Sequence, residues 1–260
     1  MKQSIALLLM LLPAPSAAQT APLPRPSAQA VVGKLIDGDP WGFGGAIVAA
    51  RATLKDKRGA TSELAFSVRS RRYTPQFSKA LVRFTAPADV AGAGFLQIQK
   101  RDGDDERFLF LPELKRSRRI SGNLRGSSFM GTDFSFADLD RRDLRDSSVS
   151  ALPDENIGKF ACFRLDIKPT RSDSPYSHTE IWVRMDNYLP LKMKMFDRSN
   201  VLAKTFSALE VQRIKGQWFV TKSSMVDHGQ EHETSLVLES VEPTTSLTDD
   251  EFTVRNLEKL

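Results

Sequence analysis

The stretch FLFLPELKRSRRISGNLRGSSFMGTDFSFADL, residues 108–139, combines four kinds of sequence in a short length of chain. A wholly apolar run ends at Pro112, a cluster of Lys and Arg follows, a turn of small residues comes next, and the last part is rich in Phe. An apolar strand, a positively charged rim and an aromatic short helix so close together predict a function in binding. They do not suggest the breaking of a covalent bond.

The first residues predict export. Lys2 precedes an apolar run over residues 5–12, and Ser16, Ala17 and Ala18 supply the small residues that signal peptidase prefers. We therefore expect a signal peptide over residues 1–18, cleaved after Ala18, and a single mature domain over residues 19–260. No Cys stands at the cleavage site, so we expect no lipid anchor and a location in the periplasm.

From Gly44 onward, apolar and polar residues alternate in segments bounded by Gly, Pro, Asn or Asp, which is typical of antiparallel strands. We predict roughly ten to eleven strands. The predicted faces are Leu64, Phe66 and Val68; Ile181, Val183 and Met185; and Leu191, Met193 and Met195.

Two helices interrupt this pattern. One is predicted over residues 28–35, and a short one over residues 131–140, capped by Asp133 and carrying Phe134, Phe136 and Leu139. The predicted fold class is therefore mainly β: a curved antiparallel sheet forming an unclosed half-barrel with a few short lid helices.

The formal net charge of +5 is concentrated locally, at Arg69, Arg71 and Arg72 and over residues 115–119. Export argues against nucleic acid as a partner. An anionic membrane surface or lipid headgroup is the better candidate, because each Lys or Arg adds roughly 1 kcal/mol of attraction there. A merely solvated face is the alternative.

Catalytic motifs are missing from the sequence. There is no GxSxG elbow and no GxxxxGK[ST] phosphate loop, and the acidic residues 104–106 resemble a solvated hairpin tip. His228 and His232 are expected to be surface residues, although a metal site with Glu231 or Glu233 is a weak alternative. The lone Cys162 is expected to be a small buried hydrophobe. We predict no enzyme, no catalytic residue, no metal and no cofactor.

Several motifs together resemble the outer-membrane lipoprotein-sorting protein family, the LolA-like proteins of Gram-negative periplasms. The first motif is the opening stretch, with Phe110-Leu111-Pro112, then Arg118-Arg119-Ile120, then SFMGTDF at residues 128–134. The second is EIWVRMDNYLPLKMKMFDRSN at residues 180–200, followed by WFVTKSSM at residues 218–225. Phe110 stands where the family usually shows Tyr, and Thr132 where Ser is common.

The resemblance implies a half-barrel with an apolar concave side covered by helices, which holds lipid or acylated lipoprotein cargo during transfer toward the outer membrane. Expected cavity and lid residues are Phe66, Phe108, Phe110, Phe129, Met130, Phe134, Phe136, Leu139, Trp182 and Met193. The expected rim for headgroups, membrane or partner comprises Lys115, Arg116, Arg118 and Arg119.

Two alternatives remain open. The aromatic residues of the expected lid could be permanent core, with no room for cargo beneath them. The protein would then be an accessory binding subunit of an inner-membrane exporter of the RND or ABC type, without a cargo cavity of its own.

Overall fold

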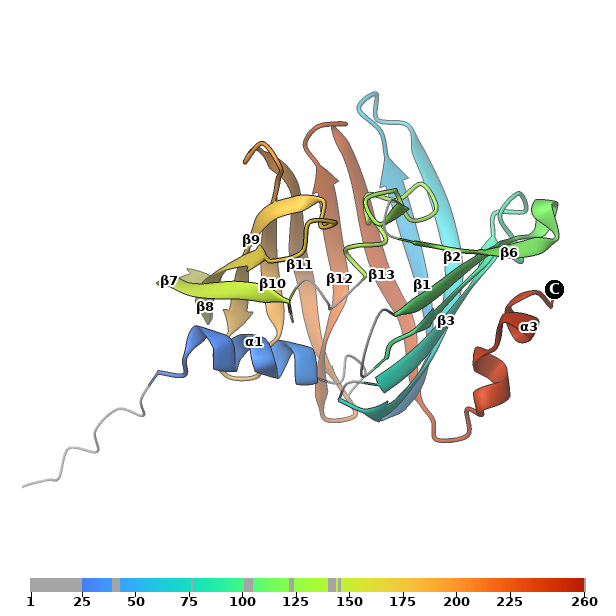
Figure 1. The fold of residues 1–260 in the computed structure, drawn as a ribbon, viewed down its shortest axis with the longest axis horizontal. Coiled ribbons are helices and arrows are strands. Elements are labelled where there is room, and N and C mark those ends of the chain that lie inside the picture. The colour runs from blue at the N-terminus through green and yellow to red at the C-terminus, as the bar shows by residue number, and fades with distance from the viewer. Residues whose placement is uncertain are drawn as a thin grey trace, which may run out of the picture.

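The computed structural model describes residues 25–38, 43–75, 77–100, 105–121, 124–139, 144 and 146–259. Within these residues, one curved antiparallel sheet of thirteen strands dominates the molecule (Figure 1). The sheet is not closed into a barrel, since β6 forms one edge and β7 the other. The strands are β1 (Gly45–Lys55), β2 (Thr61–Thr74), β3 (Phe77–Ala86), β4 (Gly94–Ile98), β5 (Glu106–Leu111), β6 (Arg116–Arg119), β7 (Ser147–Ile157), β8 (Phe160–Pro169), β9 (Tyr176–Arg184), β10 (Pro190–Asp197), β11 (Leu202–Ile214), β12 (Gln217–Asp227) and β13 (His232–Pro243).

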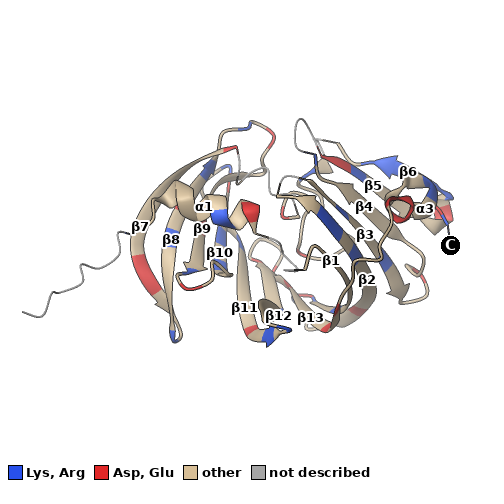
Figure 2. Ribbon diagram, turned by 90° about the horizontal axis from the view of Figure 1, so that it is seen from below, with Lys and Arg blue, Asp and Glu red and all other residues tan. Residues whose placement is uncertain are grey.

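The predicted half-barrel is confirmed, although the predicted number of strands was too low. The strand order runs β6-β5-β4-β3-β2-β1-β13-β12-β11-β10-β9-β8-β7. The chain therefore starts in the middle of the sheet, meanders to one edge, and returns from the opposite edge to pair β13 with β1. Figure 2 shows β6 and β7 at opposite sides of the curved sheet. The connection from β6 to β7 must therefore cross from one edge to the other.

Helix α1 (Ala28–Asp37) covers the concave face of the β7–β10 half (Figures 1 and 2). Its N-cap is Ser27, whose hydroxyl accepts a hydrogen bond from the Ala30 amide at 3.2 Å. The buried residues Val31, Val32 and Ile36 pack against apolar side chains of β8 and β9. The predicted helix over residues 28–35 is thus confirmed and is slightly longer than expected.

The C-terminal segment covers the opposite, outer face of β3–β5. It consists of the 3-10 helix η3 (Asp249–Phe252) and α3 (Val254–Leu257), whose Phe252 and Leu257 are fully buried. Gly94 permits this close approach, because a Cβ there would lie only 2.7 Å from Leu257 Cδ1. A further 3-10 helix, η1 (Pro112–Leu114), links β5 to β6.

The connection between the two sheet edges differs from the prediction. Residues 125–139 form turns around an isolated bridge between Ser128 and Ser135, and the predicted short helix is absent from residues 131–139, the described part of its range. Asp133 caps nothing there, because its carboxylate bonds to the sheet instead. The predicted signal peptide, residues 1–18, lies outside the described residues. Within the described part of the chain, no helix has the length and apolar character needed to cross a membrane.

Candidate functional site

A cavity of about 390 Å³ lies on the concave face of β1–β4 and β13. Most of its walls are apolar, and residues 129–139 close it on the side away from the sheet. We call residues 124–139 the lid segment and this space the first cavity. Its lining residues are Val48, Ala50, Ala52, Phe66, Val68, Ser70, Ser78, Ala80, Val82, Phe84, Phe95, Gln97, Gln99, Asp105, Phe129, Thr132, Phe134, Leu139, Thr234, Leu236 and Leu238. Its volume is within the roughly 300–1,000 Å³ range of small-molecule sites.

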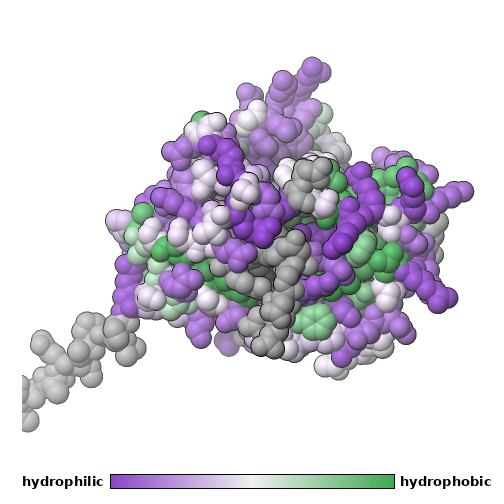
Figure 3. All heavy atoms as spheres, viewed as in Figure 1, coloured by the Kyte–Doolittle hydropathy of each residue, from purple (hydrophilic) through white to green (hydrophobic). Residues whose placement is uncertain are grey.

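A second cavity, of about 270 Å³, lies on the other side of the lid segment. Strands β8–β12 supply most of its walls, with Met193, Met195 and Met225 among them. Phe134 and Leu139 line both cavities, so these two side chains form the partition between them. On the face viewed in Figure 3, hydrophobic residues are visible in the recess between hydrophilic ones.

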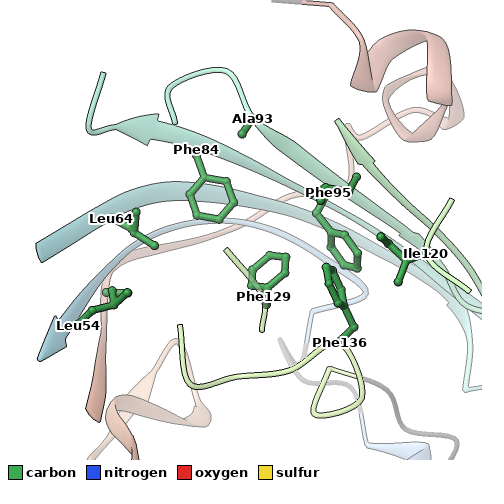
Figure 4. Packing of buried hydrophobic residues seen from close by; sticks show 10 residues of the cluster. Leu54, Leu64, Phe84, Ala93, Phe95, Ile120, Phe129 and Phe136 are labelled. Carbon is green, nitrogen blue, oxygen red and sulfur yellow. The ribbon is translucent and has the colours of Figure 1, made fainter. Parts of the chain in front are cut away.

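The lid segment is held to the β1–β5 half by aromatic packing. Figure 4 shows Phe129 and Phe136 pointing from the lid segment toward Phe84 and Phe95 of the sheet. The Phe95 ring centroid lies 5.1 Å from that of Phe129 and 5.6 Å from that of Phe136. Both lid rings are buried, so these two residues of the lid segment are part of the core.

Polar bonds hold the middle of the lid segment to β13. The buried Asp133 carboxylate accepts a hydrogen bond from Thr234 Oγ1 at 2.6 Å, and His232 Nδ1 lies 2.8 Å from its Oδ2. The Asp133 amide in turn donates to Thr234 Oγ1 at 2.9 Å. A buried carboxylate needs such partners, because removing it from water without them is costly.

A second group of polar bonds reaches β9 and β11. Lys204 Nζ donates to the Asp133 carbonyl at 2.7 Å and lies 3.4 Å from Asp138 Oδ2. The Tyr176 hydroxyl donates to Asp138 Oδ1 at 2.7 Å. Burial, together with the Asp138 charge, raises the pKa of Tyr176, so its hydroxyl keeps the proton that it donates.

The start of the lid segment is fixed by an ion pair. Arg125 is buried, and its Nη1 lies 3.1 Å from Asp173 in the loop between β8 and β9. Arg171 donates two hydrogen bonds to the same carboxylate, at 2.9 and 3.0 Å. These bonds, together with the Arg125 charge, lower the pKa of Asp173 to about 2.

The structure brings five of the expected cavity residues to the two cavities: Phe66, Phe129, Phe134, Leu139 and Met193. Two others, Met130 and Phe136, pack into the core beside the first cavity and do not line it. All of them come from the concave face or the lid segment.

Three expected cavity residues lie on the outer face, so their placement in the cavity was wrong. Phe108 and Phe110 pack beneath the C-terminal segment, because in β5 it is Leu109 that faces the hollow. Trp182 packs on the outer side of β9 with Leu191, whereas Ile181 and Val183 face α1. Side chains alternate along a strand, and a phase error of one residue moves every side chain to the other face.

The expected basic rim lies on the edge strand β6 and the residue before it, as Figure 2 shows. Lys115, Arg116, Arg118 and Arg119 are all exposed, and the neighbouring Leu114 is 50% exposed. Among these four, only Arg119 has an acidic partner within the described residues, Glu106 at 4.0 Å. The rim thus presents positive charge beside an exposed apolar side chain.

Sequence reasoning missed several residues. His232 was expected at the surface, yet it contacts the lid carboxylate and its side chain is only 22% exposed. Asp105 was expected to be solvated, but it is buried and lies 3.3 Å from Arg107. Asp105 and Arg107 are two residues apart, so an extended chain places their side chains on the same face. This spacing is the feature of the sequence that could have indicated the ion pair. No group of three or more potential metal-ligating side chains occurs among the residues that the structure describes.

The fold and the cavities define a class: LolA-like half-barrel proteins with an apolar interior. A family model described as "-like: Uncharacterized protein" matches residues 76–259, which is more than half of the chain. The chain therefore belongs to that family. No curated protein matches the sequence.

Solved structures support the same class. A domain described as an outer membrane lipoprotein-sorting protein, from Vibrio parahaemolyticus, is 27% identical with a TM-score of 0.82, over 89% of this chain and 98% of that one. A DUF1329 family protein from Desulfovibrio piger is 24% identical with a TM-score of 0.81, over 88% and 97%. A LolA superfamily protein from Nitrosomonas europaea shares the fold at 20% identity, with a TM-score of 0.69 over 88% and 98%.

Proposed function

We propose that this protein is a periplasmic carrier that shields the hydrocarbon of a lipid or an acylated lipoprotein on its way toward the outer membrane. The observation that carries the proposal is the pair of apolar cavities beneath one lid segment. The similarity to a domain described as a lipoprotein-sorting protein supports it. The role is binding and transfer, without a catalytic step.

Energetics explain why a carrier needs such a hollow. Burying one methylene group contributes about 0.8 kcal/mol, so a chain of about 14–16 carbons needs roughly 11–13 kcal/mol of shelter to leave a membrane. A carrier must nearly match this free energy, yet a much tighter carrier would not deliver. Flexible Met193, Met195 and Met225 in the second cavity let it adapt to varied chain shapes.

The lid segment is proposed to be the gate. Its attachment at Asp133 and Asp138 is polar, so water can replace those hydrogen bonds when it lifts. Lifting Phe134 and Leu139 would join the two cavities into one. Phe129 and Phe136, which flank Phe134 in the chain, remain in the core and would serve as hinges.

The basic rim is proposed to dock on an anionic membrane surface while cargo is exchanged. Three of its four charges have no acidic partner among the described residues, and these charges with the exposed Leu114 beside them suit an interface of phosphate headgroups and acyl chains. Docking on an inner-membrane exporter is the alternative use of the same surface.

The test uses a dansyl-labelled undecanoic acid, whose fluorescence rises in an apolar site. Phe134→Asp places a carboxylate in the partition between both cavities, so we expect binding to weaken about tenfold or more. Leu209→Asp is the control, because Leu209 is 50% exposed on β11. Circular dichroism verifies that both variants fold. Equal probe binding by wild type and Phe134→Asp would contradict the cavity as the binding site.

A further inference from the structure

The first cavity has a polar end. Along β2 and β3, the cavity-facing residues change from Phe66 and Val82 to Ser70 and Ser78. On β4 they change from Phe95 to Gln97, and Gln99 follows directly after the strand. Because neighbouring strands are in register, these polar residues gather in two adjacent rows across the sheet.

The pairing of the strands defines the two rows. Ser70 is paired with Ala80, and Ala80 with Gln97, which makes the first row. In the second row, the Gln99 amide donates to the Ser78 carbonyl at 2.9 Å, and Asp105 follows on the chain that leads into β5. Val48, Val68 and Val82 are paired across three strands and form one apolar row, which continues the same surface of the cavity.

The polar end is buried but not fully hydrogen-bonded within the protein. Ser70 is 7% exposed and Gln99 is 8% exposed. Gln99 Oε1 accepts a hydrogen bond from Ser78 Oγ at 2.7 Å. The Gln99 side-chain NH₂ and the Ser70 hydroxyl make no hydrogen bond to any other residue that the structure describes, and both residues line the cavity. Both groups belong to residues that line the cavity, so a ligand in the cavity can hydrogen-bond to them.

The cavity is lined by one charged side chain at this end. Arg72 is paired with Ser78 nearby, but it does not line the cavity, and its guanidinium donates to the Thr74 and Asp37 carbonyls. Asp105 is the one ionisable residue among the described lining residues of the first cavity. Its carboxylate accepts hydrogen bonds from the Lys100 amide at 3.1 Å and from Arg107 Nη2 at 3.3 Å. A headgroup that binds here therefore meets hydroxyl and amide groups beside a neutralised carboxylate. This environment favours an uncharged headgroup with oxygen atoms over an anionic one.

We propose that the first cavity binds an amphiphile with an uncharged, hydroxylated headgroup, such as glycerol or a sugar. The headgroup lies against Ser70, Gln97 and Gln99, and the hydrocarbon tail lies along the row of valines toward Phe84 and Phe95. This inference rests on the proposed function, because it states which class of lipid the same cavity selects. The position of the polar end also fixes the orientation of the cargo, with its headgroup in the cavity on the concave face of the sheet.

The test compares two probes with one acyl chain, 1-monolauroylglycerol and methyl laurate, in displacement of the dansyl-labelled fatty acid. Wild type is expected to bind the glycerol ester about tenfold more tightly, the factor that one or two good hydrogen bonds supply. Gln99→Leu is expected to bring the two affinities together by removing the polar partner. Ser70→Ala, a smaller change, is expected to reduce the ratio about threefold.

The control is Gln217→Leu, the same substitution at an exposed residue of β12, which should leave the ratio unchanged. Equal affinity of wild type for the two probes would overturn this inference while leaving a hydrocarbon carrier intact. An unchanged ratio in both Gln99→Leu and Ser70→Ala would also overturn it. If neither probe displaces the fatty acid and the fatty acid itself does not bind, the proposed function fails as well.

Discussion

Asp133 connects the lid segment to the sheet through more bonds than its neighbours do. Its carboxylate, amide and carbonyl groups bond to Thr234, His232 and Lys204, on two different strands. Asp133 belongs to the SFMGTDF motif, and from its neighbours in the sequence it was predicted to cap a short helix. These partners are 71 to 101 residues away in the chain, so local reasoning could not identify them.

Asp133→Asn tests this attachment. The amide lacks the negative charge, and its NH₂ cannot accept from His232 Nδ1 as the second carboxylate oxygen does, so we expect a loss of about 1.5–3 kcal/mol in the free energy of unfolding. Hydrogen exchange of the Phe129 and Phe136 amides, which bond within the lid region, should become faster. Asp89→Asn, at an exposed turn residue, is the control. Unchanged lid exchange in Asp133→Asn would show that these bonds do not hold the lid segment.

Asp173 gives a prediction of pH dependence. Its pKa is lowered to about 2 by the Arg171 hydrogen bonds and the Arg125 charge, against an ordinary pKa of about 3.9. A carboxyl whose pKa is lower in the folded state stabilises the fold above its unfolded pKa. This contribution is lost as the pH falls from about 4 to about 2.

The measurement is urea unfolding of wild type and Asp173→Asn between about pH 2 and pH 7. We expect the variant to be less stable by a constant amount above about pH 5, and the difference to shrink toward zero near pH 2. Asp89→Asn again supplies the comparison. A difference that persists undiminished at pH 2 would mean that the ion pair is not its cause.

Among the elements, the strands with strict alternation were the most predictable. Leu64, Phe66 and Ile181 face the interior as their spacing indicated. The run ERFLFL of β5 has no alternation that distinguishes its faces, which is why Phe108 and Phe110 were assigned to the wrong one. Only the contact with the C-terminal segment decides the phase.

Irregularities in strand pairing could not be predicted from the sequence either. Leu191, Met193 and Met195 were expected on one face, but Leu191 lies outside with Trp182 while both methionines line the second cavity. A shift in the pairing with β9 between Pro190 and Lys192 accounts for the change.

The two edge strands were missed for a different reason. β6 is a short run of charged residues, and β7 is largely exposed and contains Pro153. Neither buries a continuous apolar face, so neither shows strand periodicity. Edge strands tolerate charge and proline because one side makes no ladder hydrogen bonds.

The β6 edge carries the prediction for membrane docking. Arg116→Gln with Arg118→Gln removes two exposed charges, so binding to vesicles with anionic phosphatidylglycerol should weaken, each charge supplying about 1 kcal/mol. Wild-type binding should also fall between about 0.05 and 0.5 M salt. The control is the double variant Lys57→Gln with Arg58→Gln, which removes two positive charges from the turn after β1 and leaves the rim unchanged. Salt-independent binding, or equal loss in the control, would exclude the rim as the docking surface.

For the whole molecule, topology explains why a lid exists. The chain finishes one half of the sheet at β6 and begins the other half at β7, on the opposite edge. The connecting residues must cross the hollow, and their Phe134 and Leu139 divide it in two. The resemblance of the sequence to LolA-like proteins indicated a half-barrel whose concave side is covered. The division into two cavities and the polar end of the first depend on register between distant strands, which a single sequence does not reveal.

A carrier of this kind must hold the hydrocarbon of a lipid in its hollow. Native mass spectrometry of the protein, purified without detergent from the cells that make it, detects such a bound lipid. We expect a population heavier than the polypeptide by the mass of one lipid, which chloroform extraction removes and the Phe134→Asp variant lacks. A single lipid-free mass for the wild-type protein, which stays unchanged after incubation with 1-monolauroylglycerol, would contradict it.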